Sequence, residues 1–267
     1  MADCGTSTGG EGGAEAPYPV VTAPVFHAPA SALASALPAA HLRLEGPEGR
    51  HAATVRRVAR GEVVDLVDGE GTRVRCVVVA VGRDTVDLDV TQRVVEPNPS
   101  PRLVLAQALV KGDRGELAVE LATEAGVDEV IPWVAARSVA QWRGERGERA
   151  LERWRSTARE AAKQSRRARW PLVPALCDGT EMAGRAAGCA LAVVLHEEAA
   201  EPLAGLALPT AGDVLVVVGP EGGLTGAELA AFAAVGARAC HLGPGVLRAS
   251  TAGAAALAVL SAVDRWR

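Results

Sequence analysis

The feature that most constrains the fold of this chain is a proline-rich segment at residues 96–101, where the sequence pattern changes. This segment reads Glu-Pro-Asn-Pro-Ser-Pro. Three prolines within five residues resist both helix and sheet, because proline has no backbone N–H and a fixed φ. Short strand-like segments precede the break, whereas strand-length segments that alternate with helix-length segments follow it. The sequence therefore predicts two domains of different architecture on either side of these prolines.

Residues 20–95 are expected to form a small β-barrel. Short apolar runs are separated there by turn residues such as Asp68-Gly69-Glu70-Gly71, and they lie at residues 63–67, 74–79 and 85–90. Short strands at this close spacing suit a small barrel. Residues 1–19 have little hydrophobic content, so we expect them to be a disordered tail.

Residues 102–267 are expected to form an α/β domain. Apolar runs of strand length recur along this part of the chain, at residues 103–109, 127–134, 190–195 and 214–218. Segments with helical periodicity alternate with them, at residues 113–125, 148–168, 225–234 and 251–263. Strands that alternate with helices predict a mostly parallel sheet.

The charge of the chain is unevenly distributed. A net charge of -4 argues against a protein that coats nucleic acid by bulk electrostatics, yet residues 137–169 hold eleven basic and four acidic residues. This basic helix could bind a polyanion, with Trp154 stacking on a base. In the alternative, Glu148 and Glu152 pair with neighbouring arginines on a solvated face, and Trp154 anchors the helix in the core.

The cysteines and the hydropathy exclude several classes of protein. The five cysteines are scattered, without a CxxC pair and without histidines at metal-ligand spacing, so we expect neither a disulfide framework nor a metal site. No apolar run reaches the roughly 18 residues of a membrane span, and the first residues lack the order of a signal peptide. These features predict a cytoplasmic protein with reduced thiols and no membrane partner.

A glycine-rich loop follows the strand expected at residues 214–218. It reads Gly219-Pro220-Glu221-Gly222-Gly223, and the next helix begins with Thr225 and, three residues on, Glu228, which is the pattern of a capping box. Ligands of open α/β sheets bind beyond the carboxyl ends of the strands, where glycines let the backbone approach them. The alternative is a plain strand-to-helix turn. The loop lacks the glycine spacing of a phosphate-binding fingerprint.

Two further loops follow strands in the same way. Residues 241–252 combine a short strand, a Gly/Pro loop and a helix start, and they carry Arg248. His196, Glu197 and Glu198 emerge together after the strand at 190–195, which suits a general base, a metal ligand or an exposed strand end. These loops could line one pocket from several sides, or they could be ordinary turns.

In this order, the segments resemble the RsmE family of 16S ribosomal RNA uracil-N3 methyltransferases, which belong to the SPOUT class. The resemblance spans about residues 40–263 and is carried in the second domain by residues 105–113, Glu120, residues 123–127, Ile131, Pro132, residues 137–139, Arg153, Trp154, residues 160–165, Arg167, residues 219–223 and residues 242–248. In the first domain, His51, Val55, Arg56, Arg57, Gly61, Glu62, Asp68 and Gly69 resemble the family's PUA-like RNA-recognition barrel.

The resemblance implies a fold, a reaction and partners. It implies a SPOUT α/β domain at residues 102–267 with a deep trefoil knot, a PUA-like β-barrel at residues 20–95, and a homodimer. A trefoil knot is a rare exception to the rule against threaded chains. The implied reaction transfers the methyl group of S-adenosyl-L-methionine (SAM) to N3 of a specific uridine in 16S ribosomal RNA, either free or in the small ribosomal subunit.

The resemblance also implies site residues. The cofactor-binding residues correspond here to Leu195, His196, Glu197, Gly219, Pro220, Glu221, Gly222, Gly223, Leu242, Gly243, Val246, Leu247, Arg248 and Thr251. The expected RNA-binding residues are His51, Arg56, Arg57, Lys111, Arg137, Gln164 and Arg167. Uridine N3 must lose a proton, so we expect Arg248 and Arg137 to stabilise the developing charge and Glu197 or water to take the proton.

Two positions depart from the family pattern. The family usually has arginine where this chain has Gly245, and glutamate where it has Ser250. These departures keep two alternatives open: a non-catalytic ribosomal RNA-binding or assembly factor on the same fold, and a SPOUT methyltransferase that acts on transfer RNA.

Overall fold

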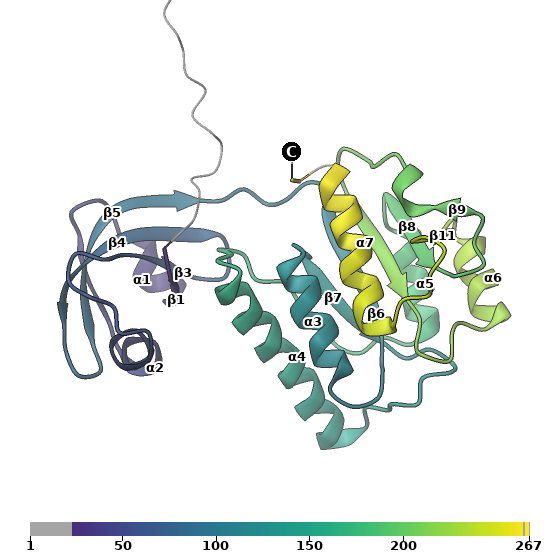
Figure 1. Ribbon diagram of the computed structural model, residues 1–267, viewed down its shortest axis with the longest axis horizontal. Coiled ribbons are helices and arrows are strands. Elements are labelled where there is room, and N and C mark those ends of the chain that lie inside the picture. Colours follow the sequence, from purple (N-terminus) through teal and green to yellow (C-terminus); the bar gives the residue numbers. More distant parts are fainter. Residues whose placement is uncertain (1–22, 264, 267) are drawn as a thin grey trace, which may run out of the picture.

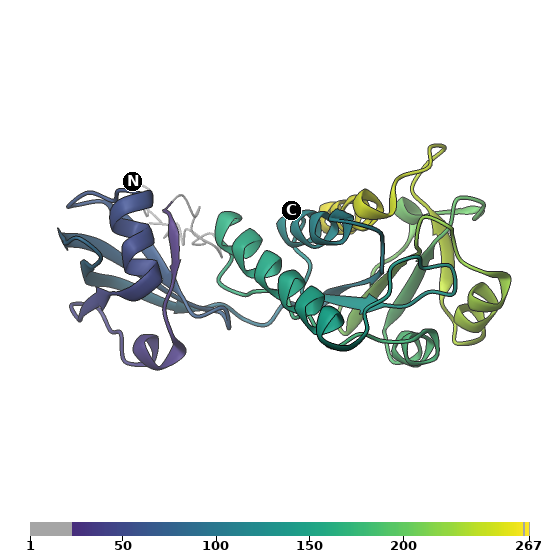
Figure 2. The ribbon, with the colours of Figure 1, turned by 90° about the horizontal axis from the view of Figure 1, so that it is seen from below.

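The computed structural model describes residues 23–263, 265 and 266, and its two lobes lie on either side of one long helix (Figures 1 and 2). The tail predicted at residues 1–19 lies outside the described residues. The amino-terminal lobe is built on a five-stranded sheet in the order β1-β3-β4-β5-β2, in which only the β1–β3 pair is parallel. Its elements are β1 (Val25–His27), α1 (Ala30–Ala34), β2 (His41–Leu44), α2 (Gly46–Arg50), the π-helical turn η1 (His51–Val55), β3 (Val63–Val67), β4 (Thr72–Val81) and β5 (Val86–Val95).

The three strands predicted in this lobe correspond to β3, β4 and β5. The carboxylate of Asp68 accepts hydrogen bonds from the amides of Glu70 (2.7 Å) and Thr72 (3.0 Å), which closes the turn between β3 and β4. Strand β5 ends at Val95, directly before the proline-rich segment. The helices α1 and α2 were not predicted, because five residues are too few to show helical periodicity.

The carboxyl-terminal lobe contains a six-stranded parallel sheet in the order β7-β6-β10-β8-β11-β9. Its strands are β6 (Arg102–Ala108), β7 (Glu129–Trp133), β8 (Leu191–Leu195), β9 (Glu201–Pro202), β10 (Asp213–Val218) and β11 (Arg238–His241). Its helices are α3 (Arg114–Glu124), α4 (Gly144–Gln164), α5 (Gly179–Ala187), the 3-10 turn η2 (Leu203–Gly205), α6 (Gly226–Ala234) and α7 (Ala249–Val263). The parallel α/β sheet predicted for this half of the chain is confirmed.

Both faces of this sheet are buried, because alternate residues of the central strands point to opposite sides. Leu105 and Val216 pack on the face that α3, α4 and α7 cover, whereas Ala106 and Val217 pack on the face that α5 and α6 cover. On the first face, a Cβ added at Gly253 of α7 would lie 2.8 Å from the Leu105 side chain. Because residue 253 is a glycine, α7 can approach the sheet closely. This close packing holds in place the loop at residues 242–248, which precedes α7.

The chain takes an unusual route at the β8 side of the sheet. Strand β11 lies between β8 and β9, so the connection from β8 to β10 runs around the outside of β11. From β11 the chain then returns to α7, which packs against β6, β10 and η2. Helix α7 therefore packs beside η2, which is part of the connection from β8 to β10.

Backbone hydrogen bonds join the two lobes. The turn between β3 and β4 meets the segment after α4, where the amide of Gly71 donates to the Ala168 carbonyl (3.1 Å) and the amide of Trp170 donates to the Gly69 carbonyl (3.0 Å). Side chains add to this junction, since Lys163 of α4 contacts the Glu48 carboxylate at 2.6 Å. The amino-terminal lobe is thereby attached to the end of the long helix seen in Figure 1.

The long basic helix differs from its prediction in both bounds. It was predicted at residues 148–168 but spans Gly144–Gln164. The helix ends earlier than predicted because Arg166 adopts a φ of 60° and the residues after it pair with the β3–β4 turn. Trp154 is buried and its ring packs edge-on against Trp142 at 5.0 Å. Trp154 is thus the core anchor of this helix and not a stacking platform. None of the described helices is long and apolar enough to cross a membrane.

Candidate functional site

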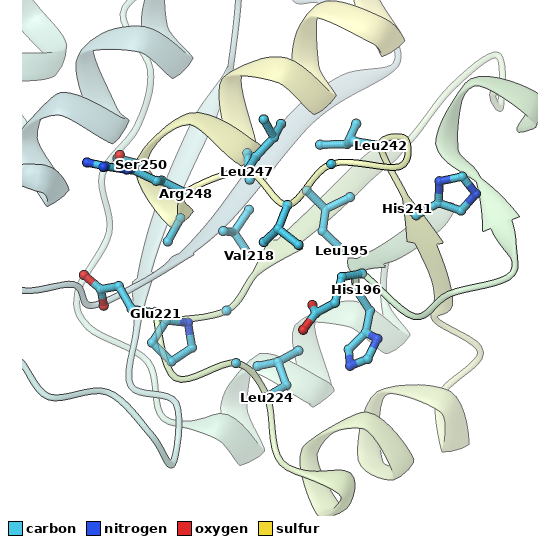
Figure 3. Close-up of a pocket in the computed structure, with 18 of the residues that line it drawn as sticks. Leu195, His196, Val218, Glu221, Leu224, His241, Leu242, Leu247, Arg248 and Ser250 are labelled. Carbon is cyan, nitrogen blue, oxygen red and sulfur yellow. The ribbon is translucent and has the colours of Figure 1, made fainter.

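Three loops meet at the carboxyl edge of the parallel sheet. Strands β10, β8 and β11 are neighbours, and their registers place Val218, Leu195 and Cys240 at one edge. The chain leaves these ends as the loops at residues 219–224, 196–200 and 242–248. Together they surround a cavity of about 340 Å³, drawn in Figure 3. A pocket beyond strand ends is where open α/β sheets bind ligands.

Most of the predicted cofactor-binding residues lie in the wall of this cavity. These are Leu195, His196, Glu197, Gly219, Pro220, Glu221, Gly223, Leu242, Gly243, Val246, Leu247 and Arg248. Gly222 and Thr251 do not line it: a Cβ at Gly222 would meet the Arg137 side chain at 3.1 Å, and the Thr251 hydroxyl donates to the Arg248 carbonyl at 3.1 Å. The wall also contains His241, Gly245, Ala249, Ser250 and Ala252, which lie in the predicted loop at residues 241–252 but were not named as cofactor-binding residues. Sequence reasoning missed Arg114, Val218, Leu224 and Cys240.

The cavity wall combines apolar side chains with charged and polar ones. In Figure 3, Glu221, Arg248 and Ser250 lie on one side, whereas His196 and His241 lie on the other side with Leu195 and Leu242. Arg114 lies beside Glu221, since its guanidinium is 3.8 Å from the Glu221 carboxylate. The site can therefore hold a molecule with an apolar or aromatic part and a charged part.

Arg137 holds the glycine-rich loop from outside the cavity. Its guanidinium donates to the backbone carbonyls of Gly222 (3.0 Å) and Leu224 (3.4 Å), and its side chain is not part of the cavity wall. Sequence reasoning expected Arg137 to act on the reacting base. In the structure, its guanidinium instead holds the backbone of the glycine-rich loop in place.

The predicted capping box anchors the other end of this loop. Thr225 accepts from the amide of Glu228 (3.2 Å), while the Glu228 carboxylate accepts from the amides of Thr225 (2.7 Å) and Ala136 (2.8 Å). Burial alone would raise the pKa of Glu228, but these hydrogen bonds outweigh it and hold the pKa below its ordinary value. The carboxylate is thus ionised at neutral pH and ties the loop to the segment that carries Arg137.

The residues present fit SAM. The leucines supply an apolar surface for a nucleobase, and polar residues of the same wall, such as His196 and Glu197, supply groups for the amino acid part. Nδ1 of His241 is buried without a hydrogen-bond partner among the described residues. Gly243 has a φ of 143°, a conformation that side chains disfavour, and a Cβ there would meet open space.

The predicted RNA-binding residues are spread over both lobes. His51, Arg56, Arg57, Lys111 and Gln164 are exposed. Arg167 differs from them, because its guanidinium donates to the Thr123 carbonyl (3.0 Å) and lies 3.6 Å from Asp128. Burial lowers the pKa of Arg167, as expected of a group inside the protein. The structure therefore places Arg167 in the packing of the lobe and not on its surface.

Ion pairs reduce the charge that the basic helix presents to solvent. Arg153 contacts Glu116 at 3.0 Å and Arg159 contacts Glu152 at 3.3 Å. Glu152 also lies 3.8 Å from Arg155, within the same helix. The helix face is therefore partly neutralised, as in the alternative weighed for this segment. Within residues 23–263, 265 and 266, no three His, Cys, Asp or Glu side chains gather as a metal site would require.

Gly245, one of the departures from the family pattern, tolerates a side chain. A Cβ at Gly245 would meet no atom within 4 Å, and its φ is not positive. The substitution G245R is expected to change the free energy of unfolding by less than about 0.5 kcal/mol. In the matched variant G243R, the new side chain stands at a φ of 143°. We expect this variant to lower the free energy of unfolding, measured by urea denaturation, by about 1–3 kcal/mol. Equal costs at the two positions would contradict this geometry.

Comparisons with known proteins identify the family of this chain. The family model for an RNA methyltransferase domain matches residues 96–261, and that for an RNA methyltransferase PUA domain matches residues 44–91. The chain is 48% identical to the ribosomal RNA small subunit methyltransferase E of Mycobacterium bovis, over 84% of this chain and 87% of the relative. It is 31% identical to the protein of the same name from Bacillus subtilis, over 82% of this chain and 88% of the relative.

A solved structure supports the same assignment. A putative methyltransferase from Legionella pneumophila, determined in complex with bound SAM, superimposes with a TM-score of 0.75 at 26% identity, over 91% of this chain and 98% of that one. The predicted SPOUT α/β fold with a PUA-like amino-terminal domain is confirmed. The predicted family is confirmed as well: this chain belongs to the ribosomal RNA small subunit methyltransferase E family of RNA methyltransferases.

Proposed function

We propose that this protein transfers the methyl group of SAM to N3 of a specific uridine in 16S ribosomal RNA. The observation that carries the proposal is the cavity that the three strand-end loops enclose, in a chain whose relatives are named for ribosomal RNA small subunit methylation. The half-apolar, half-charged wall of this cavity suits SAM. The Legionella pneumophila structure, which has this fold, was determined with SAM bound.

The loops hold and orient the cofactor in this proposal. Leu195, Leu242 and Leu247 pack against its apolar part, and Gly219, Pro220 and Gly223 lie along it. Bound there, SAM supplies an electrophilic sulfonium methyl group. The protein's own contribution is alignment of this group with the base and exclusion of water, and Arg137 contributes by holding the loop in place.

The charged residues act on the base and on the RNA backbone. Arg248, in the cavity wall, stabilises the negative charge that develops as N3 loses its proton. The sequence suggested water or Glu197, which is also in the wall, as the proton acceptor. The base must be exposed from pairing to reach them. We assign RNA contacts to the exposed residues His51, Arg56, Arg57, Lys111 and Gln164.

The proposed assembly is a homodimer in the cytoplasm. Val246 and Leu247 are 79% and 45% exposed at the edge of the cavity, and Val139 is 73% exposed nearby in the chain that leads to α4. Apolar side chains left in solvent beside a binding site suit a second copy of the chain. The route of the chain around β11 supports the proposed trefoil knot.

Calorimetry and methyl transfer together test the function. We expect the purified protein to bind SAM, and to transfer its methyl group to small ribosomal subunits or 16S RNA but not to transfer RNA. Binding of RNA without any binding of SAM would point to a non-catalytic assembly factor. Methylation of transfer RNA alone would point to the other SPOUT activity.

A further inference from the structure

Arg114 and Glu221 form a pair in the cavity wall that has no role in the reaction proposed above. Arg114 begins α3 and Glu221 lies in the loop after β10, so the pair joins two elements that are distant in sequence. Their charged groups are 3.8 Å apart, and their side chains are 46% and 37% exposed. Both residues line the cavity, and their partial exposure lets a bound molecule reach them.

The chemistry of such a pair matches the edge of uracil. This edge presents the acceptor O4, the donor N3–H and the acceptor O2 in sequence. A guanidinium beside a carboxylate presents donors and an acceptor, so Arg114 can donate to a carbonyl oxygen while Glu221 accepts from N3–H. Cytosine presents a lone pair at N3 and an amino group at position 4, so the carboxylate would face a lone pair and the guanidinium an amino group.

Glu221 is better placed to accept the N3 proton than the other carboxylate of the described cavity wall. That carboxylate is Glu197, which follows β8 and has no cation within ion-pair distance among the described residues. The other charged and titratable residues of the wall are Arg114, His196, Glu197, Cys240, His241 and Arg248. Of these, Arg114 pairs with Glu221, and Arg248 lies on the same side of the cavity in Figure 3.

We propose that Arg114 and Glu221 read the acceptor uracil and that Glu221 removes its N3 proton, an inference that rests on the function proposed above. The N3–H bond breaks as the proton passes to a carboxylate oxygen of Glu221. The N3 electron pair forms the bond to the methyl carbon and displaces the sulfur, which keeps the electrons of the broken carbon–sulfur bond as a neutral thioether. Arg114 stabilises the negative charge that develops on the uracil carbonyl oxygen.

The substitution E221Q tests this assignment, because it keeps the shape and removes the proton acceptor. We expect single-turnover methyl transfer to small ribosomal subunits to fall about 10²- to 10⁴-fold, the usual contribution of a general base. We expect the Kd of SAM, measured by calorimetry, to stay within about threefold. The rate of E221Q should also rise about tenfold per pH unit, because only uridine that is already ionised can react.

Two further variants complete the design. E124Q changes an exposed glutamate at the end of α3 that is not in this cavity wall, and we expect it to transfer at the wild-type rate. R114Q should lower the rate with SAM affinity retained, and R114K should restore part of it, because lysine also donates to a carbonyl oxygen.

The outcomes separate this inference from the proposed function. If E221Q keeps the wild-type rate, or if its rate falls only because SAM no longer binds, the inference is overturned while the proposed function stands. If the wild-type protein transfers no methyl group to any of the ribosomal RNA substrates, the proposed function itself fails.

Discussion

Replacement of Arg73 by methionine is expected to lower the free energy of unfolding by about 3–5 kcal/mol, the usual cost of removing one partner of a buried ion pair. Arg73 lies 3.2 Å from Asp65, which is completely buried, and 2.9 Å from Glu96 at the start of the proline-rich segment. It also donates to the Arg166 carbonyl after α4, at 2.9 Å. Its loss therefore leaves a buried carboxylate without one of its cations and breaks a contact between the lobes.

Urea denaturation of R73M and of a matched variant measures this effect. R43M removes an arginine that is paired with Asp87 in solvent, so we expect it to lower the free energy of unfolding much less than R73M does. Similar losses in the two variants would mean that the junction between the lobes contributes little to stability. A large loss in R73M alone would agree with the structure.

Replacement of Arg137 by methionine is expected to weaken SAM binding about 10- to 100-fold. The variant loses the charged donor to the Gly222 and Leu224 carbonyls, and a hydrogen bond from a charged group is worth about 1.5–3 kcal/mol. Since Arg137 is exposed and does not line the cavity, we expect the fold to survive. Titration calorimetry with SAM gives the Kd.

R146M is the matched control for this prediction. Arg146 is an exposed arginine of α4, and we expect its replacement to leave the Kd of SAM unchanged. An unchanged Kd in R137M would contradict the role given to Arg137, because the loop would then keep its shape without that side chain.

The sequence predicted most of the strands and helices, and the reasons for the exceptions are physical. The strand predicted at residues 63–67 matches β3, and the one at 214–218 matches β10 within one residue. The end of α4 could not be predicted, because the turn at Arg166 depends on a contact with a segment about a hundred residues earlier. Helix α5 was missed, although Asp178 and Glu181 form a capping box that marks its start in the sequence.

The candidate site was predictable where it follows strands and unpredictable where it depends on sheet order. Glycine-rich and charged loops after strands pointed to the cavity, because parallel strands end at one edge. Arg114 was missed because α3 reaches the cavity only when β6 lies beside β10, and neighbours in a sheet cannot be seen from one sequence. Arg137 was predicted, but its contacts are with the loop backbone.

The most direct test of the central claim is the content of N3-methyluridine in small-subunit RNA, measured by mass spectrometry of nucleosides. Small subunits that lack the modification are incubated with SAM and the wild-type protein. The proposed function predicts one N3-methyluridine for each 16S RNA molecule, at a single position, and none when SAM is omitted. Subunits that gain no N3-methyluridine, while calorimetry with the same protein shows that it binds SAM, would contradict it.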